Sequence, residues 1–323
     1  IKCHHPDAFL AALLNAQPLG FYSPSQLVQE ARQNGVTVLP VDIQESLAET
    51  CLTIDPIDPL APAITSDHAL DKGTHRRAVR LGLNRIAGLS TQAIASICAA
   101  REQSGPFASV EDLAHRAGKN RGALTALAAS GALRSLAGHR HQAVWASSGQ
   151  QRPPGLLRDS HINEPALILP SPTEAEDLVS DYASLGLTLG RHPLAIMRPA
   201  LDPLRVIPAA TLRYYRHGQL ARAAGLVTHR QRPGTANGTV FISLEDDTGM
   251  VNIIIWPDIL ERFNKAVLYS RLMLVYGVWQ RDRTIDPQSP GQVQHLLAQR
   301  VEDRSDLLED LIGSIAAESR DFH

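Results

Sequence analysis

A short turn near the middle of the chain has residue types that can hold a phosphate group. It is the stretch Ile86-Ala87-Gly88-Leu89-Ser90, and an amphipathic helix is predicted to follow it over residues 91–102. Gly88 permits positive φ and puts no Cβ between the turn and a ligand. Ser90 is a favourable N-cap for the helix. Backbone N–H groups at such a helix N-terminus carry partial positive charge, so the pattern predicts a phosphate contact.

A second turn, Gly118-Lys119-Asn120-Arg121-Gly122, repeats the pattern more weakly, between a helix predicted to end at Arg116 and another over residues 123–130. From Lys72 to Trp145 the chain has eleven Lys or Arg and three Asp or Glu, a net charge of +8 in a chain of net −2. Exposed amides in a basic segment are typical of sequence-independent binding to a nucleic-acid backbone. The residues predicted to contact duplex DNA are Arg85, Gly88, Leu89, Ser90, Lys119, Asn120, Arg121 and Gly122.

This pair of turns resembles a tandem helix-hairpin-helix module, with one departure. Ser90 stands where many such hairpins have a second glycine. The alternative is a small helical bundle whose glycines only end helices. The charge asymmetry of the segment favours DNA binding over that alternative.

The periodicity changes from helical to alternating after Leu220. Strands are predicted over residues 221–230, 239–246, 250–256, 271–281 and 293–301, with a helix over residues 257–268. Five strands with a helix before the fourth is the order of an OB-fold, a barrel that commonly binds single strands through a basic groove and stacking aromatics. The residues predicted to face a single strand or a partner are Arg222, His229, Arg230, Phe241, Trp256 and Arg281. For the two aromatic residues of this set, the alternative is a place in the barrel core.

Length and composition limit the classes of protein to which the chain can belong. A length of 323 residues suggests two or three domains. No apolar run approaches the twenty or so residues of a membrane-spanning helix, and no signal peptide opens the chain. The three cysteines, Cys3, Cys51 and Cys98, are far apart and form no CxxC, which predicts reduced thiols in the cytoplasm and no structural zinc site. Because the first residue is Ile rather than Met, we expect a piece of a longer protein.

The predicted fold class is multidomain α+β. The first residues have an α/β pattern, with helices over residues 6–15 and 24–34 and a strand over residues 36–39. Residues 54–74 and 138–172 are rich in proline or lack periodicity, so irregular structure is predicted for both. Further helices are predicted over residues 173–184 and within the acidic residues 302–321.

Several segments together resemble the bacterial C-family DNA polymerases, and within them the error-prone branch related to the DNA polymerase III alpha subunit. These segments are Phe9–Asn15, Gln17–Tyr22, Val38–Asp42, Arg80–Leu89 and Leu185–Leu194. The resemblance implies a C-terminal portion of such a polymerase. Its implied domains are the end of the fingers domain at 1–70, the tandem helix-hairpin-helix module at 71–146, a linker and helical connector at 147–210, the OB-fold at 211–303 and an acidic helix or tail at 304–323.

The resemblance also implies damage-tolerant DNA synthesis by the full-length polymerase. Magnesium ions held by palm-domain aspartates would serve that reaction, and a sliding clamp and accessory translesion proteins would be partners, in the bacterial cytoplasm at the nucleoid. The matching Asp-x-Asp positions are absent from this chain, as are a P-loop, a Gly-rich dinucleotide turn and a Ser/His/Asp set. This piece is therefore expected to bind primer–template duplex and single-stranded template, to hold no metal and not to synthesise DNA alone.

Three alternatives remain open. The chain could be a non-enzymatic adaptor that binds branched or gapped DNA. The barrel with the acidic tail could be a protein-interaction platform, because the region from Arg213 to Arg300 has many acidic residues. A tRNA-anticodon-type OB protein is the third, although no synthetase active-site motif accompanies the barrel.

Overall fold

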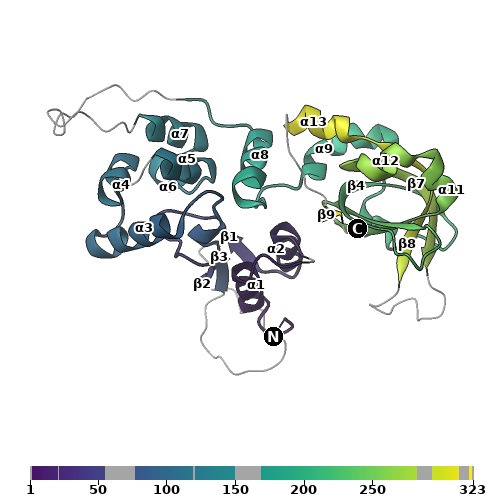
Figure 1. Cartoon of the computed structure of the whole chain (residues 1–323), viewed down its shortest axis with the longest axis horizontal. Helices are drawn as coiled ribbons and strands as arrows, with labels where there is room; N and C mark the ends of the chain where they lie inside the picture. Colours follow the sequence, from purple (N-terminus) through teal and green to yellow (C-terminus); the bar gives the residue numbers. More distant parts are fainter. Residues whose placement is uncertain are drawn as a thin grey trace. The chain divides into compact units, whose positions relative to one another are not determined.

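The computed structural model describes residues 2–20, 22–54, 77–118, 121–149, 169–281, 293–312 and 320–321. The chain divides into two compact units, residues 1–189 and residues 190–323 (Figure 1). Each unit has its own hydrophobic core.

Unit 1 begins with two helices that the sequence predicts well, α1 (Pro6–Asn15) and α2 (Pro24–Gln33). Ser23 caps α2 because its side chain accepts a hydrogen bond from the Gln26 amide, while the Gln26 side chain accepts one from the Ser23 amide. This reciprocal capping box, with Pro24 at the first helical position, fixes where the helix starts.

A small sheet joins segments that are distant in sequence. Its strands are β1 (Thr37–Leu39), β2 (Cys51–Ile54) and β3 (Arg77–Arg80), in the order β1-β3-β2. β3 runs parallel to β1 and antiparallel to β2. The sequence predicts only the first of these strands, because three or four residues are too short to establish an alternating pattern.

The rest of unit 1 is helical. The turn Leu83–Arg85 (η1) is a single 3-10 turn, so the first hairpin has only this turn before its second helix. The helices that follow are α3 (Thr91–Ser104), α4 (Val110–Arg116), α5 (Arg121–Ala129), α6 (Arg134–Ala137), α7 (Arg140–Ser148) and α8 (Glu174–Leu185). The prediction of irregular structure from residue 138 onward is wrong for α7. Its buried positions include Arg140 and Ser147 while Val144 and Trp145 are exposed, so no apolar period marks the helix.

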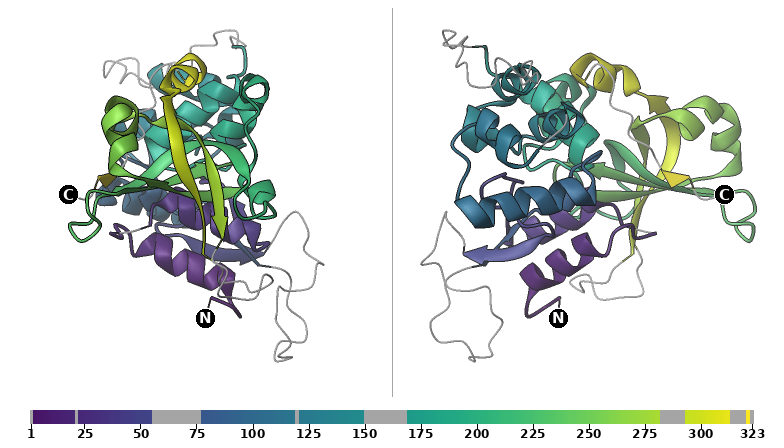
Figure 2. Two further views of the ribbon diagram at one scale, coloured as in Figure 1. Left: turned by 90° about the vertical axis from the view of Figure 1, so that its right-hand side faces the viewer. Right: turned by 60° about the vertical axis from the view of Figure 1, so that its left-hand side comes forward.

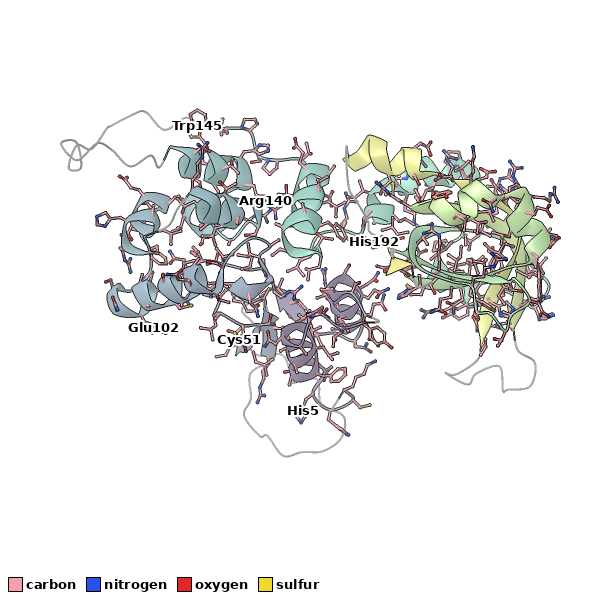
Figure 3. All side chains as sticks on the ribbon, viewed as in Figure 1. His5, Cys51, Glu102, Arg140, Trp145 and His192 are labelled. Atoms are coloured by element: carbon pink, nitrogen blue, oxygen red, sulfur yellow. The ribbon has the colours of Figure 1, made fainter. Side chains whose placement is uncertain are left out.

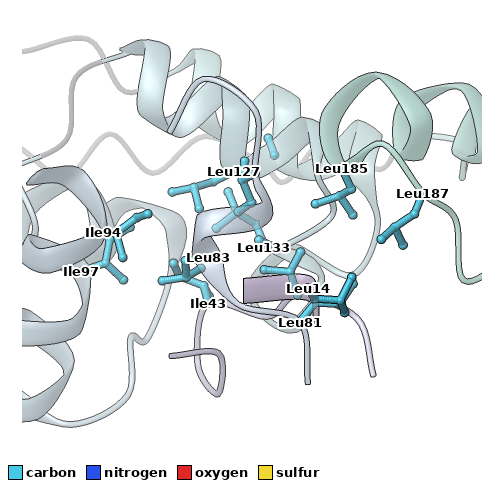
Figure 4. Packing of buried hydrophobic residues seen from close by; sticks show 14 of the residues in the cluster. Leu14, Ile43, Leu81, Leu83, Ile94, Ile97, Leu127, Leu133, Leu185 and Leu187 are labelled. Carbon is cyan, nitrogen blue, oxygen red and sulfur yellow. The ribbon is translucent and has the colours of Figure 1, made fainter. Parts of the chain in front are cut away.

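One hydrophobic core connects the sheet with the hairpin helices (Figure 4). Leu14 of α1, Leu81 after β3, Ile97 of α3 and Leu127 of α5 are all almost fully buried in it, as is Leu187 after α8. The predicted domain boundary at residue 70 falls in 55–76, outside the described residues, and the domain boundaries remain predictions.

Unit 2 is built on a closed five-stranded barrel, as predicted. Its strands are β4 (Leu220–Gln231), β5 (Val240–Asp246), β6 (Gly249–Ile255), β7 (Leu272–Arg281) and β8 (Gln294–Asp303). The order is β5-β6-β8-β7-β4, and β4 closes the barrel by pairing with β5. Neighbouring strands are antiparallel except β6 and β8, which are parallel. With helices α11 (Pro257–Arg262) and α12 (Asn264–Tyr269) between β6 and β7, this is the OB-fold.

The barrel interior is filled by alternate residues of the strands, as closure requires. Trp279 of β7 is the aromatic residue of this core, with 3% of its surface exposed. Elements outside the barrel complete the unit: α9 (Pro193–Leu201), η3 (Asp202–Leu204), α10 (Ala209–Leu212), α13 (Ser305–Ile312) and β9 (Arg320–Asp321). Among the described helices of the chain, none is long and apolar enough to cross a membrane.

Candidate nucleic-acid interface

The first hairpin turn lies between η1 and α3 and is held from both sides. Ile86 and Ile94 are buried in the core of unit 1, and the Ile86 amide donates to the carbonyl oxygen of Leu83. Gly88 has φ +78°, in the left-handed region, and a Cβ built there would meet no atom within 4 Å. Ser90 caps α3 as predicted, its side chain accepting a hydrogen bond from the Ala93 amide at 3.2 Å. The turn is therefore fixed in shape and open on its outer side.

The backbone amides of this turn differ in what they bind. The Ala87 amide donates to the carbonyl oxygen of Ser184 in α8, at 2.8 Å. The amides of Gly88 and Ser90 have no hydrogen-bond acceptor among the residues that the structure describes. Both residues are exposed and Leu89 is half-buried. Two free N–H groups beside a helix N-terminus can bind an anionic oxygen.

Arg85 adds a positive charge directly before the turn. Burial lowers the pKa of its guanidinium from the ordinary value. An arginine nevertheless stays charged at neutral pH. Its Nε is buried and has no partner within the described part of the chain. A partly desolvated charge attracts a phosphate more strongly than a fully hydrated one.

The second hairpin turn is described in part. Gly118, after α4, has φ +60°, and α5 starts at Arg121. Arg121 and Gly122 are exposed. Lys119 and Asn120, two of the predicted contact residues, lie outside the described residues. Both hairpins thus have a left-handed glycine, at Gly88 and Gly118, and an exposed helix start.

Most arginines of the basic segment bind acceptors inside unit 1. Arg101 donates to the carbonyl oxygen of Ile43, and Arg116 to those of Ala100 and Gly105. The other arginines with such partners are Arg80 with Glu45, Arg134 with Asp177, and Arg140 with Asp177 and Asp181. The net charge of the segment therefore overstates the cations that a DNA backbone could meet.

Arg140 organises the end of the hairpin module. Its side chain is 5% exposed and lies between α5 and α8 (Figure 3). It binds Asp177 at 2.5 Å, Asp181, and the carbonyl oxygen of Ser130 at 3.3 Å. This buried cation links the second hairpin to the connector helix.

In unit 2, two predicted aromatic residues lie on the outside of the barrel. Phe241 is 38% exposed and Trp256 is 49% exposed, so the alternative that they fill the core is wrong for both. Phe241 pairs with Ile254 across β5 and β6. On the same face Met250 and Asn252 are exposed as well. The residues predicted for this face do not include Met250, Asn252 and Ile254, although a spacing of two along β6 is the signal for one face of a strand.

The four predicted basic residues of the barrel occupy different environments. Arg222 is half-buried, donates to the carbonyl oxygen of Leu204 at 3.0 Å and lies 5.1 Å from the centre of the Tyr276 ring. His229 is half-buried on β4, beside Ser243 of β5. Arg281 is half-buried at the end of β7 and donates to the carbonyl oxygen of Arg213.

Arg230 is a correction to the predicted face. It is buried, with 8% of its surface exposed, and donates to the carbonyl oxygens of Val267 and Ser270 at the end of α12. These bonds satisfy carbonyls that the helix end leaves without an intrahelical partner. Arg230 therefore stabilises the barrel and does not face a ligand.

The described residues contain no group of three or more His, Cys, Asp or Glu side chains that could hold a metal ion. The described residues therefore offer no ligand set for the magnesium that the polymerase resemblance implies.

Comparison with known proteins adds sequence evidence to this geometry. A helix-hairpin-helix motif family matches residues 35–143, which contain both hairpin turns. Error-prone DNA polymerase from Ralstonia nicotianae is 49% identical over the whole of this chain, and the one from Burkholderia pseudomallei is 48% identical. The chain is homologous to part of the error-prone DNA polymerases. It spans 28% of the length of these curated relatives.

Similarity to solved structures is slight in comparison with this polymerase homology. Asparaginyl-tRNA synthetase from Pyrococcus horikoshii matches 31% of this chain and 22% of its own, at 20% identity and a TM-score of 0.25. A likeness of this extent carries no functional meaning.

Proposed function

We propose that this chain is the C-terminal DNA-binding portion of an error-prone DNA polymerase. The hairpins hold the duplex backbone behind the active site, and the barrel guides the single-stranded template. The observation that carries the duplex assignment is the open turn at Gly88, with two unpaired amides beside the charged Arg85. Contacts through amides and arginines to phosphate position a protein on DNA without reading its sequence. A polymerase needs this property because it moves along every template.

The wider role rests on the relatives that are named error-prone DNA polymerase. Under this proposal the full-length protein performs damage-induced translesion synthesis with magnesium, together with a sliding clamp and accessory proteins, in the cytoplasm at the nucleoid. The segment Gln150–Leu157, which vaguely resembles clamp-docking peptides, lies outside the described residues.

The barrel assignment is tested with Phe241→Ala and Trp256→Ala. Binding of the chain to a fluorescent dT oligonucleotide of about 16 nucleotides, the upper end of one OB-fold's site size, is measured by anisotropy. Loss of stacking on either ring should weaken binding about fivefold or more. Tyr269→Ala is the matched control, since Tyr269 is 75% exposed on α12 of the same unit. Equal binding by all three variants and the unaltered chain would contradict this role for the two aromatic residues.

One observation favours a second function for the β5–β6 face. Neither strand contains Lys or Arg. The exposed Phe241 pairs with the half-buried Ile254, and the exposed Met250 lies further along the same face of β6. An apolar face without cations suits a protein partner better than a phosphate backbone. Under this alternative the barrel is a protein-interaction platform, and Phe241→Ala leaves oligonucleotide binding unchanged.

A further inference from the structure

The neighbouring strands β4, β7 and β8 of the barrel form a second outer face. These strands contain arginines, whereas β5 and β6 contain neither Lys nor Arg. β7 pairs with β4 on one side and with β8 on the other, and β7 and β8 lie side by side in front in the left view of Figure 2. Tyr276 in the central strand is paired with Arg222 of β4 and with Arg300 of β8. An aromatic ring thus lies between two arginines across the three strands.

The contacts of this row are specific. The guanidinium carbon of Arg222 lies 5.1 Å from the centre of the Tyr276 ring, and that of Arg300 lies 5.4 Å from it. Both distances are within the range of cation–π attraction. The backbones of β4 and β8 are two strand spacings apart, so the two arginines start about 10 Å from each other. The ring therefore holds the two guanidinium groups on the outer side of the sheet.

The chain segment before α10 lies beside β4 on the side away from β7. Arg222 donates to the carbonyl oxygen of Leu204, and the Ile207 amide donates to that of Arg222, so residues 204–207 lie along β4. Arg205 in this segment is exposed and has φ 54°, an uncommon left-handed conformation for a residue with a Cβ. This conformation ends the short helix η3. Arg222 and Arg300 form a line of cations with Tyr276 between them.

An aliphatic row runs beside the cations. Leu220 of β4 pairs with Val278 of β7, which pairs with Leu297 of β8. Leu220 is 72% exposed, and the other two are half-buried. Bases of a single strand need such a surface to pack on, and their phosphates need the cations.

The acidic residue of the face does not cancel this charge. Glu302 binds Arg300 at 2.7 Å, but the Arg300 side chain is 62% exposed. An exposed ion pair is weak and is readily exchanged for another anion. The face therefore keeps a positive excess that β5 and β6 lack.

We propose that the β4–β7–β8 face is a contact surface for single-stranded DNA, in which the exposed Arg300 binds a phosphate, Arg222 holds the Tyr276 ring, and Tyr276 with the aliphatic row supports bases. This rests on the proposed function of the barrel and extends its contact with the template strand from β5–β6 to a second face. An acidic protein partner on the same face is the competing assignment, and unchanged oligonucleotide binding in all variants of this face would favour it.

The decisive variant adds charge instead of removing it. Leu220→Lys changes an exposed side chain, so folding is not at risk, and it places a cation beside Arg222. The binding of the dT oligonucleotide to the full chain is measured as a function of salt. Leu220→Lys exchanges one apolar contact for a cation. Because each phosphate contact contributes about 0.7 to the slope for single strands, the salt slope of this variant should be steeper by about 0.7. Arg300→Gln should lower the slope by about the same amount, and Tyr276→Leu should weaken binding about fivefold or more.

Lys265→Gln on α12 is the control, since it removes one exposed charge of the same unit elsewhere. Cross-linking with an oligonucleotide that contains 5-iodouracil gives a second readout, with Tyr276 as the expected adduct. Unchanged binding in Leu220→Lys, Arg300→Gln and Tyr276→Leu overturns the proposal. If Phe241→Ala and Trp256→Ala still weaken binding in that case, the barrel keeps its single-strand role on β5–β6. If no barrel variant changes oligonucleotide binding, the proposed single-strand role of the barrel is wrong as well.

Discussion

Single residues decide whether the first hairpin can approach a phosphate. Gly88 has the left-handed backbone and empty outer side that the sequence predicts. Arg230 and Arg101 show what a sequence cannot reveal at this scale. Each donates to carbonyl oxygens that are distant in the chain, and no local pattern marks such a bond.

Gly88→Ala should destabilise the chain by roughly 1 kcal/mol or more, because an alanine is strained at positive φ. The unpaired amides would move with the backbone, so duplex affinity should fall as well. Urea unfolding and duplex binding measure the two effects. Gly149→Ala is the control, since that glycine has φ −72° and ordinary contacts. Wild-type stability in Gly88→Ala would rule out the strained turn.

Arg140→Met should destabilise unit 1 by about 3–5 kcal/mol, because Asp177 and Asp181 would lose their buried cation. Arg134→Met is the matched control. Arg134 binds the same Asp177 but is 47% exposed, so its loss should cost about 1 kcal/mol or less. Denaturant unfolding of both variants gives the comparison, and similar losses would show that burial of the pair is unimportant.

Among the elements, helices with strong caps and strands with strict alternation follow from the sequence. α1, α2 and the barrel strands lie close to their predicted ranges because proline, serine and the period of two mark them. β2 and β3 are missed since they are short, and α7 is missed because it buries an arginine and a serine. Whether these elements form depends on contacts with residues that are distant in the sequence.

The start of α4 gives a pH-dependent prediction. The Ala108 amide and the Arg116 guanidinium both donate to the Asp112 carboxylate, and they hold its pKa below the ordinary value. Because the unfolded chain binds the proton more tightly, this stabilisation is present above the unfolded pKa of about 3.9 and is lost as the pH falls through the folded pKa. Asp112→Asn should therefore be less stable than the parent at neutral pH, and the difference should shrink in acid.

Urea unfolding of the two proteins at neutral pH and at about pH 3 measures this difference. Glu111→Gln is the control, because it removes an exposed charge from the same helical turn. A loss in Asp112→Asn that is equal at both pH values would refute the assignment.

For the whole molecule, the sequence predicts the order of hairpins and OB-fold, and it predicts the polymerase homology. It does not reveal that the hairpins share a core with the β1–β3–β2 sheet, since β3 is too short to recognise. It also overstates the basic surface, because charge counts do not distinguish an exposed arginine from one bound to a carbonyl.

The chain alone should not extend a primer. The described residues hold no carboxylate cluster for magnesium, and the sequence has no Asp-x-Asp pair. A primed template with magnesium and all four nucleotides is the assay, and binding of the same template confirms that the chain is folded. Extension that survives repurification of the chain would contradict the prediction.

The central claim is that the hairpins hold the duplex backbone, and the salt dependence of duplex binding tests it most directly. Affinity is measured over a range of salt for the unaltered chain and for Lys119→Ala combined with Arg121→Ala. Lys2→Ala with Arg32→Ala is the control, as it removes the same charges from unit 1 outside the hairpins. Weaker duplex binding by the hairpin variant, with a slope lower by about 0.9 for each lost phosphate contact and a control that binds normally, is the predicted result. If the hairpin variant binds duplex with the slope and affinity of the unaltered chain, the hairpins are a scaffold and the claim is wrong.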